Sequence, residues 1–167
     1  MRIFLVGFMG SGKSTTGRAL ARRLGVLFWD LDARIEASLR MSVADVFARH
    51  GEAAFRQAEG RQLAACVRLP AAVVAAGGGT FGSETNRATI ARLGVSVFLD
   101  LPWGEILRRL PGKREERPLF SSPEQAHSLY LARLPYYRMA DVRVRPAAGE
   151  DAEALAARIA ILLESRV

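Results

Sequence analysis

Five short apolar runs are spread along the chain, and stretches with helical periodicity separate them. The runs predict strands at residues 3–6, 26–29, 72–76, 95–99 and 142–144. Recurring apolar positions, with capping residues and glycines at their ends, predict helices after residue 13 and over 33–39, 42–51, 52–69, 83–93, 102–109, 123–134 and 151–165. Alternation of strands and helices is typical of a parallel sheet. The pattern therefore predicts an α/β fold.

The composition fits this picture and narrows the class of protein. The chain has 167 residues, of which 50% are hydrophobic and 25% charged, as expected of one compact core-forming domain. Its apolar runs are too short for a signal peptide or a membrane span, so we expect a cytoplasmic protein without a membrane partner. The single cysteine, Cys66, cannot form an internal disulfide.

The first strand leads directly into a glycine-rich stretch. Residues 7–14 read Gly-Phe-Met-Gly-Ser-Gly-Lys-Ser, which is the G-x-x-x-x-G-K-[ST] phosphate-binding pattern. Its glycines let several backbone N–H groups point at one centre, and the following helix adds the positive end of its dipole. Lys13 would reach the β- and γ-phosphates, and the Ser14 hydroxyl would coordinate Mg²⁺. A dinucleotide site is disfavoured, because Thr15 stands where G-x-G-x-x-G requires a third glycine.

Two further strands end in residues suited to a ligand. Asp30 and Asp32 follow the second strand, and Gly77, Gly78 and Gly79 follow the third. One aspartate can hold Mg²⁺ through water while the other accepts the proton of an attacking hydroxyl. The alternative for Asp32 is a cap on the next helix, and the alternative for the glycines is a flexible turn. Both features would lie at the carboxyl edge of the sheet, where open α/β sheets bind ligands.

The basic residues are numerous but dispersed. The formal net charge is +7, and the densest group is Arg108, Arg109, Lys113, Arg114 and Arg117. No aromatic stacking platforms are interleaved with the arginines, which disfavours a nucleic-acid partner. The polar segment that starts at Pro111 carries most of this group and is typical of a mobile lid that closes over bound ATP.

In motif order and spacing the chain resembles the shikimate kinases over essentially its whole length. The resemblance rests on residues 10–15, the Asp30-x-Asp32 strand end, Phe55-Arg56-x-x-Glu59, residues 77–79, Arg117-Pro118-Leu119 and Arg133-x-Pro135-x-Tyr137. It implies a three-layer P-loop kinase fold with a five-stranded parallel sheet ordered 2-3-1-4-5 and helices on both faces. It also implies one domain over 1–167, a lid at about 111–124 and an acceptor-binding segment at about 33–62. The implied activity is transfer of the ATP γ-phosphoryl group to the 3-hydroxyl of shikimate.

The resemblance also implies a role for each matching residue. The implied catalytic residues are Lys13, Asp32 and Arg117. The implied ATP-binding residues are Gly10, Ser11, Gly12, Lys13, Ser14, Thr15, Arg109 and Arg117. The implied shikimate-binding residues are Asp32, Phe47, Phe55, Arg56, Glu59, Gly77, Gly78, Gly79 and Arg133. Mg²⁺ is the implied cofactor, held by Ser14 and, through water, by Asp30.

One stretch departs from the family pattern, and two other functions remain open. Residues 144–149 read Val-Arg-Pro-Ala-Ala-Gly where the family commonly has an Asp-containing loop, which puts the adenine contacts in doubt. A kinase acting on gluconate or a nucleoside monophosphate would also keep the phosphate loop, but it has less reason for Asp32, Arg56 and Arg133 together. A non-catalytic ligand sensor would tend to lose Lys13, Ser14 or Asp32. We expect a monomer.

Overall fold

A computed structural model describes residues 1–110 and 122–165, and its centre is a five-stranded parallel sheet. The strands are β1 (Arg2–Val6), β2 (Leu27–Asp30), β3 (Ala72–Ala75), β4 (Val95–Leu99) and β5 (Val142–Val144). They lie in the order β2-β3-β1-β4-β5, with every neighbouring pair parallel. This confirms the sheet order that the resemblance implied. It also puts the strand that leads into the phosphate loop in the middle of the sheet.

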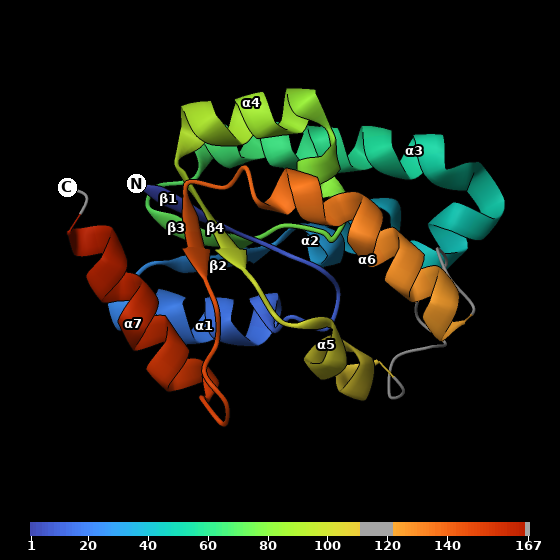
Figure 1. Cartoon of the computed structure of the whole chain (residues 1–167). Coiled ribbons are helices and arrows are strands. Elements are labelled where there is room, and N and C mark those ends of the chain that lie inside the picture. The colour runs from blue at the N-terminus through green and yellow to red at the C-terminus, as the bar shows by residue number, and fades with distance from the viewer. Residues whose placement is uncertain (111–121, 166–167) are drawn as a thin grey trace.

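Helices cover both faces of the sheet (Figure 1). They are α1 (Lys13–Leu24), α2 (Leu31–Leu39), α3 (Val43–Ala65), α4 (Glu84–Leu93), α5 (Trp103–Arg109), α6 (Pro123–Tyr137) and α7 (Ala152–Glu164), with short 3₁₀ turns at Cys66–Arg68 and Thr80–Gly82. Alternate side chains of β1 point to opposite faces. Ile3 and Leu5 pack with α1 and α7, whereas Phe4 and Val6 pack with residues of α4, α5 and α6. This alternation on a strand buried on both faces is what the apolar run at residues 3–6 requires.

Gly51 divides α3 into the two helical segments that the sequence predicts. The hydrogen-bonded helix extends from Val43 to Ala65, but Gly51 has φ 78° and ψ 172°, a conformation outside the helical region. Such a positive φ is readily adopted only by glycine. The two predicted helices are therefore real helical segments that meet at a kink. The second ends earlier than predicted, because Cys66–Arg68 forms a 3₁₀ turn.

The region between β2 and β3 has an apolar cluster of its own. Ile35 of α2 packs against Val46, Phe55 and Ala58 of α3, and all four side chains are buried. Phe47 lies against the same cluster, with its ring centroid 4.7 Å from that of Phe55. These residues fall within the segment predicted to bind the acceptor, and their packing holds α2 against α3.

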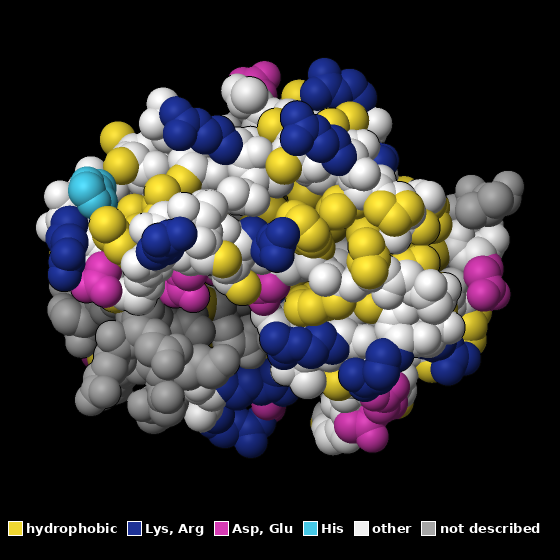
Figure 2. Space-filling view, turned by 180° about the vertical axis from the view of Figure 1, so that it is seen from behind, with side chains coloured by type: hydrophobic (Ala, Val, Ile, Leu, Met, Phe, Trp, Pro, Cys, Tyr) yellow, Lys and Arg dark blue, Asp and Glu magenta, His cyan; other side chains and the backbone are white. Residues whose placement is uncertain are grey.

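The surface offers no single basic face in the view of Figure 2. There Lys and Arg side chains form separate groups divided by other side chains. Among the described residues, no helix is both long enough and apolar enough to cross a membrane. The predicted lid over 111–124 lies outside the described residues up to position 121. Ser122 then caps α6 by accepting a hydrogen bond from the backbone N–H of Gln125.

Candidate active site

A cavity of about 750 Å³ opens at the carboxyl ends of β1, β2 and β3. Its walls come from the phosphate loop, the end of β2, α3, the glycines after β3, and α6. Segments distant in the sequence meet there because parallel strands present their carboxyl ends at one edge of the sheet. The cavity size is within the range of small-molecule sites.

The phosphate loop presents its lysine and serine to this cavity. The Lys13 ammonium donates hydrogen bonds of 2.9 Å to the carbonyl oxygens of both Gly7 and Phe8. The Ser14 hydroxyl donates to Oδ2 of Asp30 over 2.7 Å. Helix α1 begins at Lys13, directly after Gly12, and has no acidic residue in its first turn. The positive end of its dipole therefore faces the cavity without a side-chain carboxylate of its own to compete with a bound phosphate.

The Phe8 side chain packs the phosphate loop against α5 and α6, a role that the sequence analysis did not assign. Its side chain is buried, and its ring meets Trp103 of α5 and Tyr130 of α6 edge-on, with centroids 6.4 and 5.6 Å away. Such edge-to-face pairs are favourable beyond the apolar area that they bury. The contacts tie the loop to the two helices that flank residues 111–121.

The two aspartates have different roles at the start of α2. Asp30 is the helix cap, since its Oδ1 accepts hydrogen bonds from the backbone N–H groups of Asp32 and Ala33. The capping alternative considered for Asp32 was therefore wrong, and the cap is two residues earlier. The Asp32 side chain instead lines the cavity, and its Oδ1 is buried without a hydrogen bond to any described residue.

The surroundings of Asp32 make its carboxyl a weak acid. Burial, and to a lesser extent the neighbouring Asp30 carboxylate, raise its pKa from 3.8 to about 6, against a smaller opposing effect of Lys13. A carboxyl with this pKa is mostly ionised at pH 7 and has a higher proton affinity than a solvated aspartate. Such matching of pKa to the operating pH favours proton transfer.

Two arginines approach consecutive glycines on the other side of the cavity. A Cβ atom on Gly79 would lie 2.4–2.7 Å from the guanidinium atoms of Arg56, and one on Gly78 would lie 3.1 Å from Nη1 of Arg133. A side chain at position 79 would therefore displace the Arg56 guanidinium. Nη1 of Arg133 is buried and makes no hydrogen bond to a described residue. Arg56 and Arg133 thus bring two guanidinium groups to one short loop, as an anion clamp needs.

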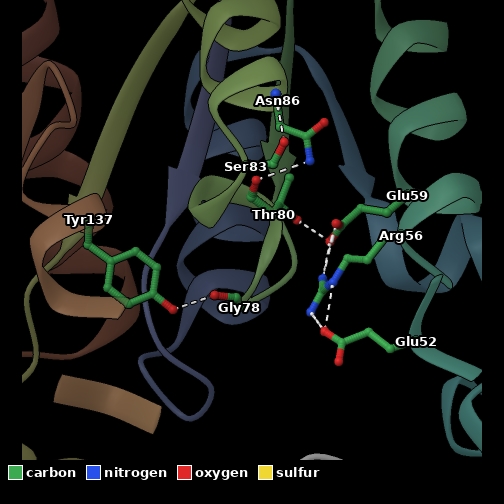
Figure 3. Close-up of polar contacts among 8 residues, drawn as sticks. All are labelled: Glu52, Arg56, Glu59, Gly78, Thr80, Ser83, Asn86 and Tyr137. Atoms are coloured by element: carbon green, nitrogen blue, oxygen red, sulfur yellow. Dashed lines mark hydrogen bonds and ion pairs between the residues drawn. The ribbon is translucent and has the colours of Figure 1, made fainter. Parts of the chain in front are cut away.

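Acidic residues hold the Arg56 guanidinium from two sides (Figure 3). Glu52 accepts from Nε and Nη2 over 3.2 and 3.1 Å, and Glu59 accepts from Nη1 over 3.1 Å to each carboxylate oxygen. Glu52 is largely exposed, whereas the Glu59 side chain is 1% exposed. The sequence analysis identified Glu59 but missed Glu52. The spacing of Glu52 four residues before Arg56 on one helix was the available signal.

Most of the predicted site residues line this one cavity. Those described there are Gly10, Gly12, Lys13, Ser14, Thr15, Asp30, Asp32, Phe47, Phe55, Arg56, Glu59, Gly77, Gly78, Gly79, Arg109 and Arg133. Ser11 is buried in the loop next to them, and Arg117 lies outside the described residues. Arg109 is exposed at the mouth, where its Nη1 donates to the Gly10 carbonyl oxygen over 3.4 Å. The cavity is also lined by residues that were not predicted as part of the site: Met9, Glu36, Ser42, Val43, Ala44, Ala75 and Ala76.

Comparison with known proteins gives a consistent result. The family model described as shikimate kinase matches residues 9–164. A shikimate kinase of Ruegeria pomeroyi is 39% identical over 167 residues, covering 98% of this chain and 85% of the relative. The structure of an Acinetobacter baumannii shikimate kinase in complex with shikimate superposes with a TM-score of 0.92 at 33% identity, covering 99% of this chain and 93% of that one. A deoxyadenosine kinase from M. mycoides, at 17% identity and a TM-score of 0.65, shares the fold alone.

Proposed function

This chain belongs to the shikimate kinase family, and from that premise we propose that it transfers the γ-phosphoryl group of ATP to the 3-hydroxyl of shikimate. One observation carries the proposal: a single cavity contains the phosphate loop, the Asp32 carboxylate and the Arg56–Arg133 pair. The loop suits a polyphosphate. The two guanidinium groups suit a carboxylate, which gluconate shares with shikimate and nucleoside monophosphates lack.

Each end of the cavity then holds one substrate. Lys13 and the N–H groups at the start of α1 bind the ATP phosphates, and Arg109 lies at the mouth next to Gly10 and Gly12. Arg56 and Arg133 bind the shikimate carboxylate, and the rings of Phe47 and Phe55 pack against the cyclohexene ring. Glu59 orients Arg56. This arrangement places the acceptor hydroxyls on the side of the cavity that holds Asp32 and the phosphate loop.

Mg²⁺ fits the residues that lie between the two ends. The Ser14 hydroxyl and the Asp30 carboxylate are already adjacent, 2.7 Å apart. The described residues contain no group of three or more His, Cys, Asp or Glu side chains placed to hold a metal. The Ser14 hydroxyl and the Asp30 carboxylate suit Mg²⁺, which usually takes one or two protein ligands and completes its shell with phosphate oxygens and water. Bound there, Mg²⁺ would neutralise the charge of the transferring phosphates.

The chemical step needs an acceptor hydroxyl that is aligned and loses its proton. Asp32 accepts a hydrogen bond from the 3-hydroxyl and takes its proton as the oxygen attacks the γ-phosphorus. Lys13 stabilises the charge that develops on the phosphoryl oxygens. We also propose that Arg117 contributes a cation at that stage, on the basis of the family resemblance. The bond between the γ-phosphorus and the β,γ-bridging oxygen breaks, which releases ADP.

A substrate panel tests the proposal. ADP release is followed in a coupled assay with shikimate, gluconate, and adenosine and cytidine monophosphates as acceptors, each with ATP and Mg²⁺. We expect turnover with shikimate only, and none without Mg²⁺. Equal or faster turnover with gluconate or a nucleotide would assign the cavity to another acceptor. Binding of ATP and shikimate without turnover would make the protein a sensor.

The remaining proposals concern the state of the protein in the cell. We propose that residues 1–167 act as one domain, because a single five-stranded sheet runs through the described residues, and as a monomer, because a net charge of +7 opposes close association of two copies. We place the enzyme in the cytoplasm, where ATP is available.

A further inference from the structure

The starting observation is a buried hydroxyl next to the acceptor side of the cavity. Thr80 follows the three glycines and opens the 3₁₀ turn Thr80–Gly82; its side chain is 0% exposed. Its Oγ1 lies 2.6 Å from Oε1 of Glu59, which is itself 1% exposed. An ionised carboxylate can only accept, so the Thr80 hydroxyl is the donor in this bond.

The bond to Thr80 settles an orientation that Arg56 alone leaves open. Nη1 of Arg56 lies 3.1 Å from both oxygens of Glu59, so this contact does not distinguish one carboxylate oxygen from the other. The terminal torsion of glutamate is intrinsically broad. The Thr80 hydroxyl selects Oε1 and thereby fixes the plane of the carboxylate. A fixed carboxylate holds the guanidinium of Arg56 in one orientation, close to Gly79.

Thr80 is in turn held in place by the start of α4 (Figure 3). The Asn86 side chain donates a 3.1 Å hydrogen bond to the Thr80 carbonyl oxygen, and the Asn86 N–H donates to the hydroxyl of Ser83, the cap of α4. The Thr80 N–H donates to the Gly77 carbonyl oxygen over 3.1 Å. These hydrogen bonds connect Thr80 both to the glycine loop and to α4, so its hydroxyl has little freedom to move.

The exposed partner of Arg56 cannot replace this support. Glu52 has a side-chain exposure of 56%, and ion pairs with solvated carboxylates contribute little orientation or free energy. Glu59 is the buried partner, and a buried carboxylate that loses a hydrogen bond is costly. The geometry of Arg56 thus depends on Glu59, and that of Glu59 depends on Thr80.

From these contacts we infer that Thr80 is a positioning residue for the acceptor: its hydroxyl orients Glu59, which orients Arg56 toward the carboxylate of the substrate. The inference rests on the proposed function for the identity of that substrate. It concerns affinity for the acid alone. Thr80 is not among the described residues that line the cavity.

The test compares three variants with the native enzyme. Thr80→Val keeps the shape and removes the hydroxyl; Thr80→Ser keeps the hydroxyl and removes the methyl group. Ser96→Ala is a matched control, because the buried Ser96 hydroxyl also lies 2.6 Å from a carboxylate, that of Asp141, near the amino end of β4 and away from the cavity. The KM for shikimate, the KM for ATP, kcat and the melting temperature are measured for each.

We expect Thr80→Val to raise the shikimate KM roughly tenfold, the usual range for a hydrogen bond to a charged group. Its ATP KM and kcat should stay within about twofold of native, and Thr80→Ser should restore the shikimate KM. Ser96→Ala should lower the melting temperature and leave both KM values unchanged. In a Glu59→Gln background Thr80→Val should have a smaller effect, because the two changes remove one shared interaction.

Three results would overturn the inference. They are an unchanged shikimate KM in Thr80→Val, an equal rise in both KM values, and a Thr80→Ser enzyme as impaired as Thr80→Val. Failure of the proposed function is separable from these, since it appears in the native enzyme as absent turnover of shikimate. In that case, calorimetric titration of the native protein and Thr80→Val with shikimate still measures the effect of the hydroxyl on binding of the acid.

Discussion

At the scale of single residues, Asp32 lines the cavity in an environment that is unfavourable for its charge. Its pKa lies near 6, above the 3.8 of a solvated aspartate, so the folded protein binds this proton more tightly than the unfolded chain does. Ionising Asp32 therefore destabilises the fold. The cost starts as the pH rises above about 3.8 and is complete above about 6. A residue that lowers stability yet lines the cavity is typical of active sites.

Asp32→Asn should stabilise the protein at pH 7.5 and lower its activity. The shift of the Asp32 pKa corresponds to as much as about 3 kcal/mol, so the variant should unfold at higher urea concentration than the native protein at pH 7.5, with a smaller difference at pH 4.5. Its kcat should fall by ~10² or more, as for other general bases. Native kcat/KM for shikimate should decline below about pH 6. The raised pKa of Asp32 would be contradicted if the gain in free energy of unfolding of Asp32→Asn over the native protein were no larger at pH 7.5 than at pH 4.5.

Arg133 tests whether the buried guanidinium recognises the acceptor. Arg133→Ala should raise the shikimate KM about tenfold to a hundredfold, the effect of losing a charge-assisted hydrogen bond, and leave the ATP KM nearly unchanged. Arg133→Lys should recover only part of the loss, since an ammonium cannot form two parallel bonds. Arg138→Ala is the control, because Arg138 is an exposed arginine at the end of the same helix.

The contact of Arg133 with the carboxylate can also be tested by changing the substrate. When a hydroxymethyl group replaces the carboxylate of shikimate, the native enzyme should already bind the analogue poorly. Arg133→Ala should then cost little more with the analogue, because substitution and analogue remove one contact. Equal losses with the acid and the analogue would show that Arg133 acts elsewhere.

At the scale of elements, the loop after β3 matters because of what approaches it. Residues 77–79 leave room for side chains from α2, α3 and α6 to converge. A methyl group on Gly77 would lie 2.9 Å from Asp32 Oδ1 and 3.1 Å from Glu59 Oε1. The triple glycine thus provides space for charged groups that come from other elements.

Gly79→Ala should displace Arg56 without unfolding the protein. Gly79 has φ −98° and ψ −12°, which alanine also adopts, so the effect is steric and not a backbone strain. We expect the shikimate KM to rise about tenfold, the value of one charge-assisted hydrogen bond, with the ATP KM unchanged. Gly60→Ala is the matched control, because its new methyl group on α3 would lie 4.0 Å from Oδ1 of Asn86, which is an ordinary van der Waals distance. That change should raise stability by up to about 1 kcal/mol. Unchanged shikimate binding in Gly79→Ala would mean that the guanidinium can act from another position.

Whether a site residue could be predicted depends on how close together in the sequence the residues lie that indicate it. The phosphate loop, the strand-end aspartates and the glycines were predictable because each signal lies within a few residues, and parallel strand ends meet at one edge. Thr80 was not, because its partner Glu59 comes from another helix. The same is true of His127, which is half-buried against Trp103, with ring centroids 4.6 Å apart. Such pairs are settled by tertiary packing alone.

At the scale of the whole molecule, charge and assembly can be tested together. The formal net charge of +7 opposes close association of two copies of the chain. Sedimentation equilibrium at physiological salt should give a mass near 18.2 kDa, with or without ATP and shikimate. A concentration-dependent mass near twice this value would contradict the proposed monomer.

The central position of β1 has a consequence for synthesis on the ribosome. β1 is made before the other four strands, yet its sheet partners are residues 72–75 and 95–98. At typical elongation rates of about 5–20 residues per second, β1 waits roughly 5–20 s before β4 is complete. Until β3 has been made, the apolar side chains of β1 have no neighbouring strand in the sheet. A nascent chain that stops before β4 contains the whole phosphate loop but lacks one of the two strands that pair with β1.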